Sequence, residues 1–190
     1  MLSQILDTAQ DLFLRYGYQG LSMRQIAEAV GVTKPALYYY FQDKEQLFLA
    51  VIQKCLEGIE RQIDQIEAEH EDARLRIRQL VKAMVEQPGQ WRALLHLASQ
   101  DNAGLSSAAQ QRLREAYRTR FMDRLREILI AGMQNNELRR LDPQAATWAL
   151  LGLLYPSLDP DQSEAASQRD RQVEDLLWIF LHGISQPGHF

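Results

Sequence analysis

The sequence predicts an all-α protein in which a small N-terminal helical unit precedes a larger helical remainder. Residues that favour helices, chiefly Leu, Ala, Gln, Glu and Arg, dominate the 190 positions, whereas only 10 Gly and 6 Pro are present. The Gly and Pro residues lie between segments whose apolar residues recur every three or four positions, which is the period of an amphipathic helix. We therefore expect helices joined by short turns.

The first two helices are predicted by their start and stop signals. Apolar residues spaced by three and four predict a helix over 4–16 that ends at Gly17. Ser22 and Gln25 then have the spacing of a capping box, in which each side chain bonds the backbone N–H of the other residue. The helix that begins there is short, because Gly31 adopts the turn conformation that ends it at little cost.

The same signals predict the remaining helices. Thr33 is a good N-cap for a third helix, which tolerates Pro35 in its first turn because a missing amide costs little there. Asp43 caps a fourth helix. We expect this fourth helix and the later ones, after a bend at 67–72 and around a loop at 156–168, over residues 44–68, 73–86, 90–100, 107–134, 143–155 and 170–184.

Several classes of protein are disfavoured by what the sequence lacks. Cys55 is the one cysteine, so no intramolecular disulfide can form, and no cysteine and histidine set has zinc-ligand spacing. We expect no metal, no cofactor and a reducing, cytoplasmic location. No segment approaches the ~18 apolar residues of a membrane span, so no membrane partner is expected. We assign no catalytic residues, because no triad order, HExxH sequence or phosphate loop stands out; a helical enzyme stays a remote alternative.

Residues 22–40 carry the most informative pattern in the chain. A capped short helix, a turn containing Gly31 and a second helix that starts two residues later follow in the order of a helix-turn-helix. Such a motif needs a small residue where its helices touch, and Ala27 meets that need. The alternative is an ordinary helical hairpin within a bundle.

Residues 22–41, which read SMRQIAEAVGVTKPALYYYF, resemble the DNA-binding segment of the TetR family of transcriptional regulators. Residues 5–18 are similar to the family's first helix, and 43–47 to the start of its fourth. The resemblance implies a helix-turn-helix DNA-binding domain over 1–46 and a helical effector-binding and dimerisation domain over 47–190. Beyond residue 50 it rests on length and helical layout.

The resemblance further implies that the helix after Thr33 enters the major groove of double-stranded operator DNA. A lysine there can reach a phosphate or a guanine edge, tyrosine hydroxyls can bond phosphates, and a proline can make apolar contact. The family pattern adds two contacts from outside this helix: Arg24 is expected to reach a base, and Lys44 is expected to bind a phosphate. The expected DNA-binding residues are Arg24, Thr33, Lys34, Pro35, Tyr38, Tyr39 and Lys44.

Alternatives stay open for some of these residues. Thr33 serves its own helix as a cap, with or without a phosphate contact, and Lys44 is either a phosphate ligand or a solvated lysine. Tyr40 and Phe41 follow Leu37 by three and four residues, so we expect both to be internal.

In the larger domain the resemblance implies a small-molecule pocket among the middle helices. Side chains that combine apolar walls with a few polar groups are expected to line it, namely Trp91, His96, Gln100, Tyr117, Phe121 and Trp148. The same residues equally describe an ordinary core with a satisfied histidine. Arg120 and Arg124 border this region and are expected to meet an anionic ligand or solvent.

The resemblance also implies dimerisation through the last two helices, whose apolar faces include Leu150, Leu154, Leu177 and Phe180. A dimer would hold two copies of the DNA-binding domain over 1–46, the reading head, about 34–36 Å apart. This distance is the spacing of successive major grooves on one face of DNA. A single helical core could use the same leucines internally.

These observations predict a homodimeric repressor that binds a palindromic operator and is released by a small-molecule effector; the alternatives are an activator or a partner-regulated protein of the same fold. The formal net charge of −4 argues against a general polyanion binder. Residues 1–50 hold four basic and five acidic side chains. We therefore expect a few cations at helix starts to contact phosphates, and a shallow dependence of DNA affinity on salt.

Overall fold

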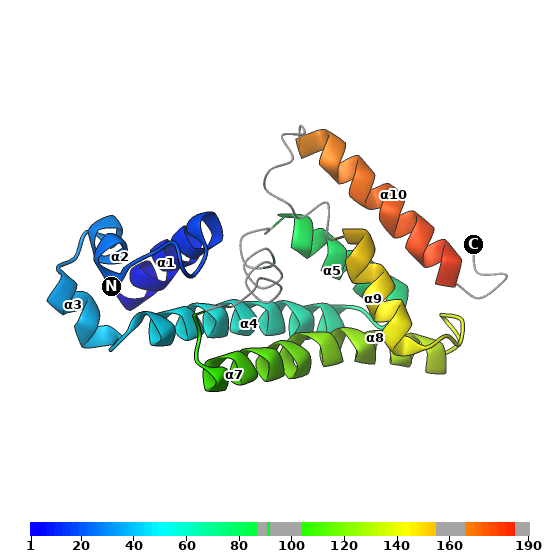
Figure 1. The fold of residues 1–190 in the computed structure, drawn as a ribbon. Coiled ribbons are helices and arrows are strands. Elements are labelled where there is room, and N and C mark those ends of the chain that lie inside the picture. The colour runs from blue at the N-terminus through cyan, green and yellow to red at the C-terminus, as the bar shows by residue number, and fades with distance from the viewer. Residues whose placement is uncertain (87–90, 92–103, 155–165, 185–190) are drawn as a thin grey trace. The chain divides into compact units, whose positions relative to one another are not determined.

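The computed structural model describes residues 1–86, 91, 104–154 and 166–184, and they confirm the all-α architecture. They divide into two compact units. The first combines residues 1–59 with 89–118, and the second combines 60–88 with 119–190. The long helix that starts at Lys44 contributes to both units (Figure 1). The functional division at residue 46 stays a prediction.

The first unit contains the predicted N-terminal helices. Its elements are α1 (Leu2–Tyr16), α2 (Met23–Val30), α3 (Lys34–Tyr40), the N-terminal part of α4 (Lys44–Glu69) and α7 (Ser107–Tyr117). The helix predicted over 4–16 begins two residues earlier, at Leu2, and no side chain caps it. Of the helix predicted over 90–100, only Trp91 lies within the described residues.

The predicted caps form in this unit. The Ser22 Oγ accepts from the Gln25 N–H, and the Gln25 Oε1 accepts from the Ser22 N–H at 2.9 Å, which completes the capping box. Gly31 ends α2 with φ 79°, in the left-handed region that favours glycine. The Asp43 carboxylate caps α4 by accepting from the Gln46 N–H at 2.7 Å.

Aromatic rings hold α1 against α4 beneath this motif. The Phe13 and Phe48 rings meet edge to face with centroids 5.1 Å apart, and Tyr18 meets Phe48 in the same way at 5.0 Å. Ile26 and Leu37 from the two helices of the motif are fully buried with them. Burial of these side chains fixes the direction in which α3 presents its opposite face.

The second unit is a helical bundle. It contains the C-terminal part of α4, α5 (Ala73–Glu86), a π-helical segment η1 (Arg118–Met122), α8 (Asp123–Gln134), α9 (Pro143–Leu154) and α10 (Ala166–Ile184). Asp72 and Asp142 cap α5 and α9 with bonds of 2.8 and 2.7 Å to backbone N–H groups. Helix α10 begins four residues before the predicted start, so 166–168 are helix and not the predicted loop.

The single helix predicted over 107–134 is interrupted. Residues Arg118–Met122 form a π-helical segment between α7 and α8, which inserts extra backbone into the turn and shifts the later side chains around the axis. Apolar periodicity did not reveal this, because Leu113, Phe121 and Leu125 are buried on both sides of the insertion. The interruption is therefore a correction to the predicted helix.

Close packing between α5 and α8 is achieved by a glycine. A Cβ on Gly132 would lie 2.6 Å from the Ala73 Cβ and 2.8 Å from a Leu138 methyl, so only glycine allows this approach. The Glu137 carboxylate accepts from the Ala73 N–H at 2.7 Å and ties the α8–α9 connection to the start of α5. Leu150, Leu154, Leu177 and other leucines of the last helices complete this core.

Candidate nucleic-acid interface

Helix α3 exposes one polar and aromatic face. Lys34 and Tyr38 lie one helical turn apart, as do Pro35 and Tyr39, and all four are exposed while Leu37 is buried on the other side. Tyr39 is 85% exposed. The Lys34 ammonium lies 5.7 Å from the centroid of the Tyr38 ring, within reach of a cation–π interaction. The helix thus presents the predicted residues together, with a cation beside the phenol ring of Tyr38.

The Thr33 hydroxyl can accept one hydrogen bond and donate another. Its Oγ1 accepts from the Ala36 N–H at 3.3 Å, so the predicted cap is present. The cap uses the acceptor capacity of the hydroxyl and leaves its O–H as a donor. Capping and phosphate binding are therefore compatible at this residue, and the phosphate contact stays a prediction.

Arg24 is held by its own helix. Its Nε donates to the Glu28 carboxylate at 2.8 Å, and both side chains are exposed. Within the part of the chain that the structure describes, the two terminal nitrogens of Arg24 have no protein partner. Those two nitrogens form the fork that pairs with a guanine edge, so Glu28 steadies the side chain without blocking it.

Lys44 has a structural role that the sequence did not reveal. Its ammonium donates to the carbonyl oxygens of Tyr18 and Leu21, both at 2.7 Å, and lies 4.3 Å from the centroid of the Tyr18 ring. Partial burial lowers the pKa of Lys44. The alternative of a solvated lysine is wrong, and one of the three N–H donors is left for the predicted phosphate contact.

The two residues expected to be internal differ. Phe41 is buried, as predicted, but Tyr40 is exposed and meets the Tyr39 ring edge to face at 5.4 Å. The prediction for Tyr40 was wrong because α3 ends at Tyr40 and Phe41 continues in extended backbone, so helical spacing no longer governs both side chains.

A clamp joins α7 to the first turn of α4. The Glu45 carboxylate accepts from the backbone N–H of Ser106 at 2.6 Å and from its hydroxyl at 2.8 Å. Just before it, a Cβ on Gly104 would come within 3.4–3.5 Å of the Gln19 and Tyr18 side chains of the α1–α2 loop. The N-terminus of α7 therefore contacts two parts of the helix-turn-helix unit.

The structure describes four of the six predicted pocket residues, so the predicted pocket as a whole stays a prediction. Trp91 and Phe121 are buried, and burial raises the pKa of Tyr117 to about 12, as expected for core side chains. Trp148 is 55% exposed on α9, which corrects its assignment to an interior pocket. His96 and Gln100 lie outside the described residues.

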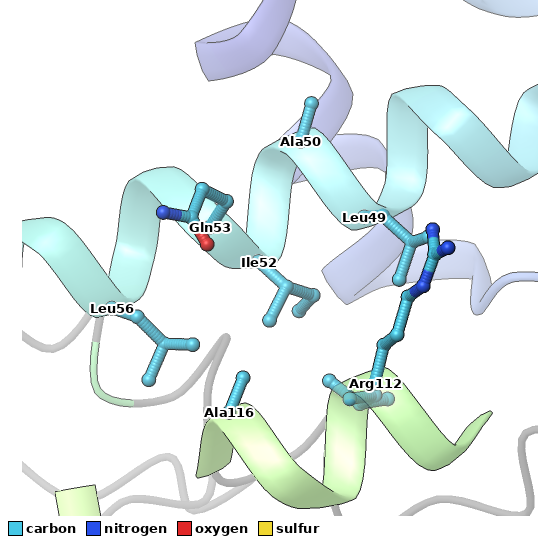
Figure 2. Close-up of a pocket in the computed structure, with 8 residues that line it drawn as sticks. Leu49, Ala50, Ile52, Gln53, Leu56, Arg112 and Ala116 are labelled. Carbon is cyan, nitrogen blue, oxygen red and sulfur yellow. The ribbon is translucent and has the colours of Figure 1, made fainter. Parts of the chain in front are cut away.

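The structure contains a groove that the sequence did not predict. It has a volume of about 320 Å³ and lies between α4 and α7, within the first unit (Figure 2). Its walls are mainly apolar, and Arg112 stands at one side. A local signal exists in the sequence: residues 47–52 are six consecutive apolar residues, so α4 is apolar beyond the face that its core requires.

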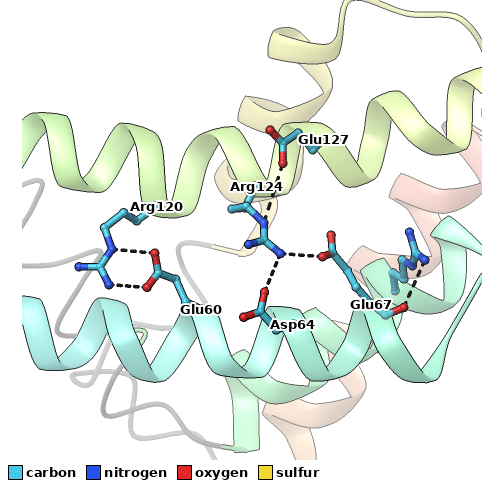
Figure 3. A network of polar contacts seen from close by, with 7 residues as sticks. Glu60, Asp64, Glu67, Arg120, Arg124 and Glu127 are labelled. Atoms are coloured by element: carbon cyan, nitrogen blue, oxygen red, sulfur yellow. Dashed lines mark hydrogen bonds and ion pairs between the residues drawn. The ribbon is translucent and has the colours of Figure 1, made fainter.

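Arg120 and Arg124 are mostly buried and pair with carboxylates of α4. Arg120 binds the Glu60 carboxylate with two nitrogens, with a distance of 2.6 Å from its Nε (Figure 3). Arg124 bridges Asp64 and Glu67 at 2.8 and 2.6 Å. These ion pairs fasten the η1–α8 segment to the C-terminal half of α4, so the solvent-facing alternative for these arginines is wrong, and their contact with an anionic ligand stays untested.

The last two helices pack together and leave an apolar face uncovered. Leu150, Leu154, Leu177 and Phe180 are buried within the chain, so they do not form a free dimerisation face as expected. The exposed side chains are different ones: Trp148 with Ala and Gly neighbours on α9, and Trp178 and Ile179 on α10, both more than half exposed. The Trp178 ring stacks on His182 at 3.8 Å.

Membrane-spanning helices and clustered metal ligands are both absent from the described residues. None of their helices combines the length and apolar character needed to cross a membrane. No group of three or more His, Cys, Asp or Glu residues among them is arranged to hold a metal ion.

Comparison with known proteins agrees with this geometry. Residues 5–51 match the family described as bacterial regulatory proteins, tetR family. The chain is 35% identical over 83 residues to the transcriptional activator FasR of Mycolicibacterium smegmatis, covering 44% of this chain and 38% of FasR. It is 45% identical over 53 residues to the transcriptional regulator RutR of Escherichia coli, covering 28% of this chain and 25% of RutR. The matched segments thus span well under half of these relatives.

Solved structures extend the similarity over the whole fold. The TetR family regulator PfmR from Thermus thermophilus superimposes with a TM-score of 0.75 at 24% identity, covering 96% of this chain and 99% of PfmR. AibR, solved in complex with isovaleryl coenzyme A and operator DNA, gives 0.72 at 24% identity and covers 92% of this chain and 95% of its own. The family that the N-terminal segment matches is one of transcriptional regulators and not of enzymes. Residues 5–51 therefore match the DNA-binding segment of the TetR family of transcriptional regulators, and the whole chain has the fold of solved members of that family.

Proposed function

We propose that this chain is a homodimeric transcriptional repressor that binds a palindromic operator and is released by a small-molecule effector. The observation that carries the proposal is the α3 face, on which Lys34, Pro35, Tyr38 and Tyr39 stand exposed together. In a helix-turn-helix the second helix enters the major groove, where a cation and phenol hydroxyls have phosphates and base edges to bind. Such a protein acts in the cytoplasm, where the DNA is.

Dimerisation is supported by the uncovered face of α9 and α10. Exposed Trp148, Trp178 and Ile179 are large apolar residues, and the neighbouring Ala149 and Gly152 let a second helix approach closely. Apolar faces of this kind are typical of obligate homodimers, in which the same patch of both subunits meets. We infer that two copies join through these helices and so space the two α3 helices on the operator.

The effector mechanism is supported by the Glu45–Ser106 clamp. Because Ser106 begins α7 and Glu45 lies in the first turn of α4, a shift of α7 acts directly on the helix that carries the reading head. An effector that binds better to one arrangement of these helices shifts the population toward it. Relatives support the effector class only in general terms, since AibR was solved with isovaleryl coenzyme A.

The experiment begins with selection of DNA from a random pool, which identifies the operator and its symmetry. Titration of the selected site with the Lys34→Ala, Tyr39→Ala double variant should then show an affinity at least about a hundredfold weaker, since a phosphate or base contact from each residue is lost on each subunit. Arg114→Ala, an exposed arginine on α7, is the matched control. Equal affinity of the double variant and the control would overturn the assignment of α3.

An activator is the second candidate. The observation that favours it is the 35% identity to FasR, an activator. Both functions use the same reading head, and the sign depends on where the operator lies relative to the promoter. A reporter assay with the selected operator at its native position distinguishes them, because deleting the regulator raises expression under repression and lowers it under activation.

A further inference from the structure

The groove between α4 and α7 has the features of a small ligand site. Ile52 and Leu56 of α4 and Leu113 of α7 form its buried floor, and Ala116 leaves space in its wall. Its volume of about 320 Å³ lies at the lower end of the roughly 300–1,000 Å³ that is typical of small-molecule pockets. None of the residues that the sequence suggested for the effector pocket lines it.

Arg112 gives the groove a single positive end. Figure 2 shows its side chain extending from α7 toward Leu49 on α4. Among the described residues no carboxylate or carbonyl is bonded to its guanidinium, and no acidic side chain lines the groove. This differs from Arg120 and Arg124, whose charges are satisfied by Glu60, Asp64 and Glu67. An arginine fork beside an apolar wall binds a carboxylate with two parallel hydrogen bonds.

We propose that this groove binds a small amphipathic carboxylate, with the carboxylate on Arg112 and an alkyl chain along Ile52, Leu56 and Leu113. One guanidinium matches one negative charge, and the volume suits an alkyl chain without a nucleotide. The occupant is therefore a short or medium-chain alkyl carboxylate. A thioester of coenzyme A carries several phosphate charges, for which the groove offers no further cation.

The position of the groove gives such a ligand a route to the reading head. Leu49 lies one turn after Glu45 on α4, and Arg112 lies about two turns after Ser106 on α7, so groove and clamp are formed by the same two helices. An alkyl chain that fills the groove changes the spacing of α4 and α7 near the contact between Glu45 and Ser106. As the identity of an effector, the inference rests on the proposed function; as a binding site, it is tested without DNA.

The test is calorimetric titration of the full chain with octanoate and with octan-1-ol, which has the same chain and no charge. We expect saturable octanoate binding at one site per subunit and clearly weaker binding of octan-1-ol. Arg112→Gln should weaken octanoate binding by about tenfold or more, since a charged hydrogen bond is lost. Arg114→Gln, an exposed arginine on the same helix outside the groove, should bind octanoate as the unchanged protein does.

A second variant addresses the apolar part of the groove. Ala116→Phe fills its wall and should abolish binding of both compounds, with circular dichroism melting to establish that the variant folds. Absence of saturable octanoate binding to the unchanged protein would overturn the inference. So would equal affinity of octanoate and octan-1-ol, or equal loss in Arg112→Gln and Arg114→Gln; the first of these comparisons needs no variant.

Operator titration separates this inference from the proposed function. Octanoate should lower the operator affinity of the unchanged protein and of Arg114→Gln, but not that of Arg112→Gln. A chain that binds its selected operator and ignores octanoate overturns the ligand site and leaves the proposed function standing. A chain that binds octanoate and selects no DNA overturns the proposed function and leaves the site standing.

Discussion

Two faces of this molecule expose aromatic side chains, and they differ in what surrounds the rings. On α3 the exposed rings are tyrosines, and Lys34 lies against one of them. On α9 and α10 the exposed rings are tryptophans, with Ile179, Ala149 and Gly152 beside them. A phenol next to a cation suits a hydrated polyanion, whereas an indole among small apolar residues suits a dry contact with another protein surface.

Exposure alone therefore does not identify a partner. Both faces are open to solvent, and the chemistry around the rings is the basis on which we propose DNA for one and a second subunit for the other. The assignments are separable, because changes on α9 and α10 should alter assembly, and changes on α3 should alter DNA binding without altering assembly.

Trp178→Glu should have the largest effect. A carboxylate replaces an indole at the centre of the proposed contact, and symmetry applies the change twice per dimer, so the dimer dissociation constant should rise by about a thousandfold or more. Sedimentation equilibrium measures this, and operator affinity should fall in parallel. Glu174→Gln, an exposed change on the same helix, is the control. A Trp178→Glu protein that remains dimeric would refute the assignment of this face.

Raising the salt concentration from about 50 to 200 mM should lower operator affinity by roughly two to three orders of magnitude and leave dimer affinity almost unchanged. Arg24, Lys34 and Lys44 on each of two reading heads set a limiting slope of about −5 for log operator affinity against log salt. The dimer contact, being apolar, should show almost no slope. Titrations at about 50 and 200 mM salt measure both. A slope near −10 would reveal a basic surface beyond these three cations.

Lys44→Met tests whether that lysine only binds DNA or also stabilises the fold of the N-terminal helices. Its ammonium bonds the Tyr18 and Leu21 carbonyls, so the variant leaves two partly buried acceptors unpaired and should lower the free energy of unfolding by about 1–3 kcal/mol. Urea unfolding followed by circular dichroism measures the loss. Lys34→Met, which removes an exposed lysine, should leave stability unchanged. Equal stability of the two variants would mean that Lys44 acts on DNA alone.

The local signals in the N-terminal region made its fold predictable. Ser22, Gln25, Gly31 and Asp43 act within a few residues of their own positions, so their caps and turns follow from short-range rules. The residues of the exposed α3 face came from the family resemblance, whereas helical spacing placed Tyr40 wrongly. What short-range rules could not give was the partner of Lys44, because Tyr18 and Leu21 are more than twenty residues away in sequence.

The larger domain was harder to predict for a related reason. A buried leucine on α9 looks the same in sequence whether it packs within the chain or against a partner, so Leu150 and Leu177 were assigned to the wrong surface. The pairs of Arg120 and Arg124 depend on tertiary contacts with α4, and apolar periodicity does not reveal the π-helical insertion at 118–122. Consecutive apolar residues in a helix, as at 47–52 and 176–181, are the usable signal: such helices pack on one side and leave another apolar face for a ligand or a partner.

Tyr39→Phe should have the smallest effect on operator affinity, and it tests the Tyr39 hydroxyl alone. The variant keeps the ring and its edge-to-face contact with Tyr40 but removes one hydroxyl per subunit, so operator affinity should fall by about three- to tenfold, with assembly unchanged. Tyr16→Phe, an exposed tyrosine at the end of α1, is the matched control. If Tyr39→Phe binds the operator as tightly as the control, the exposed ring of α3 acts by apolar contact, as the indoles of α9 and α10 do. The distinction between the two faces would then rest on Lys34 rather than on the phenol.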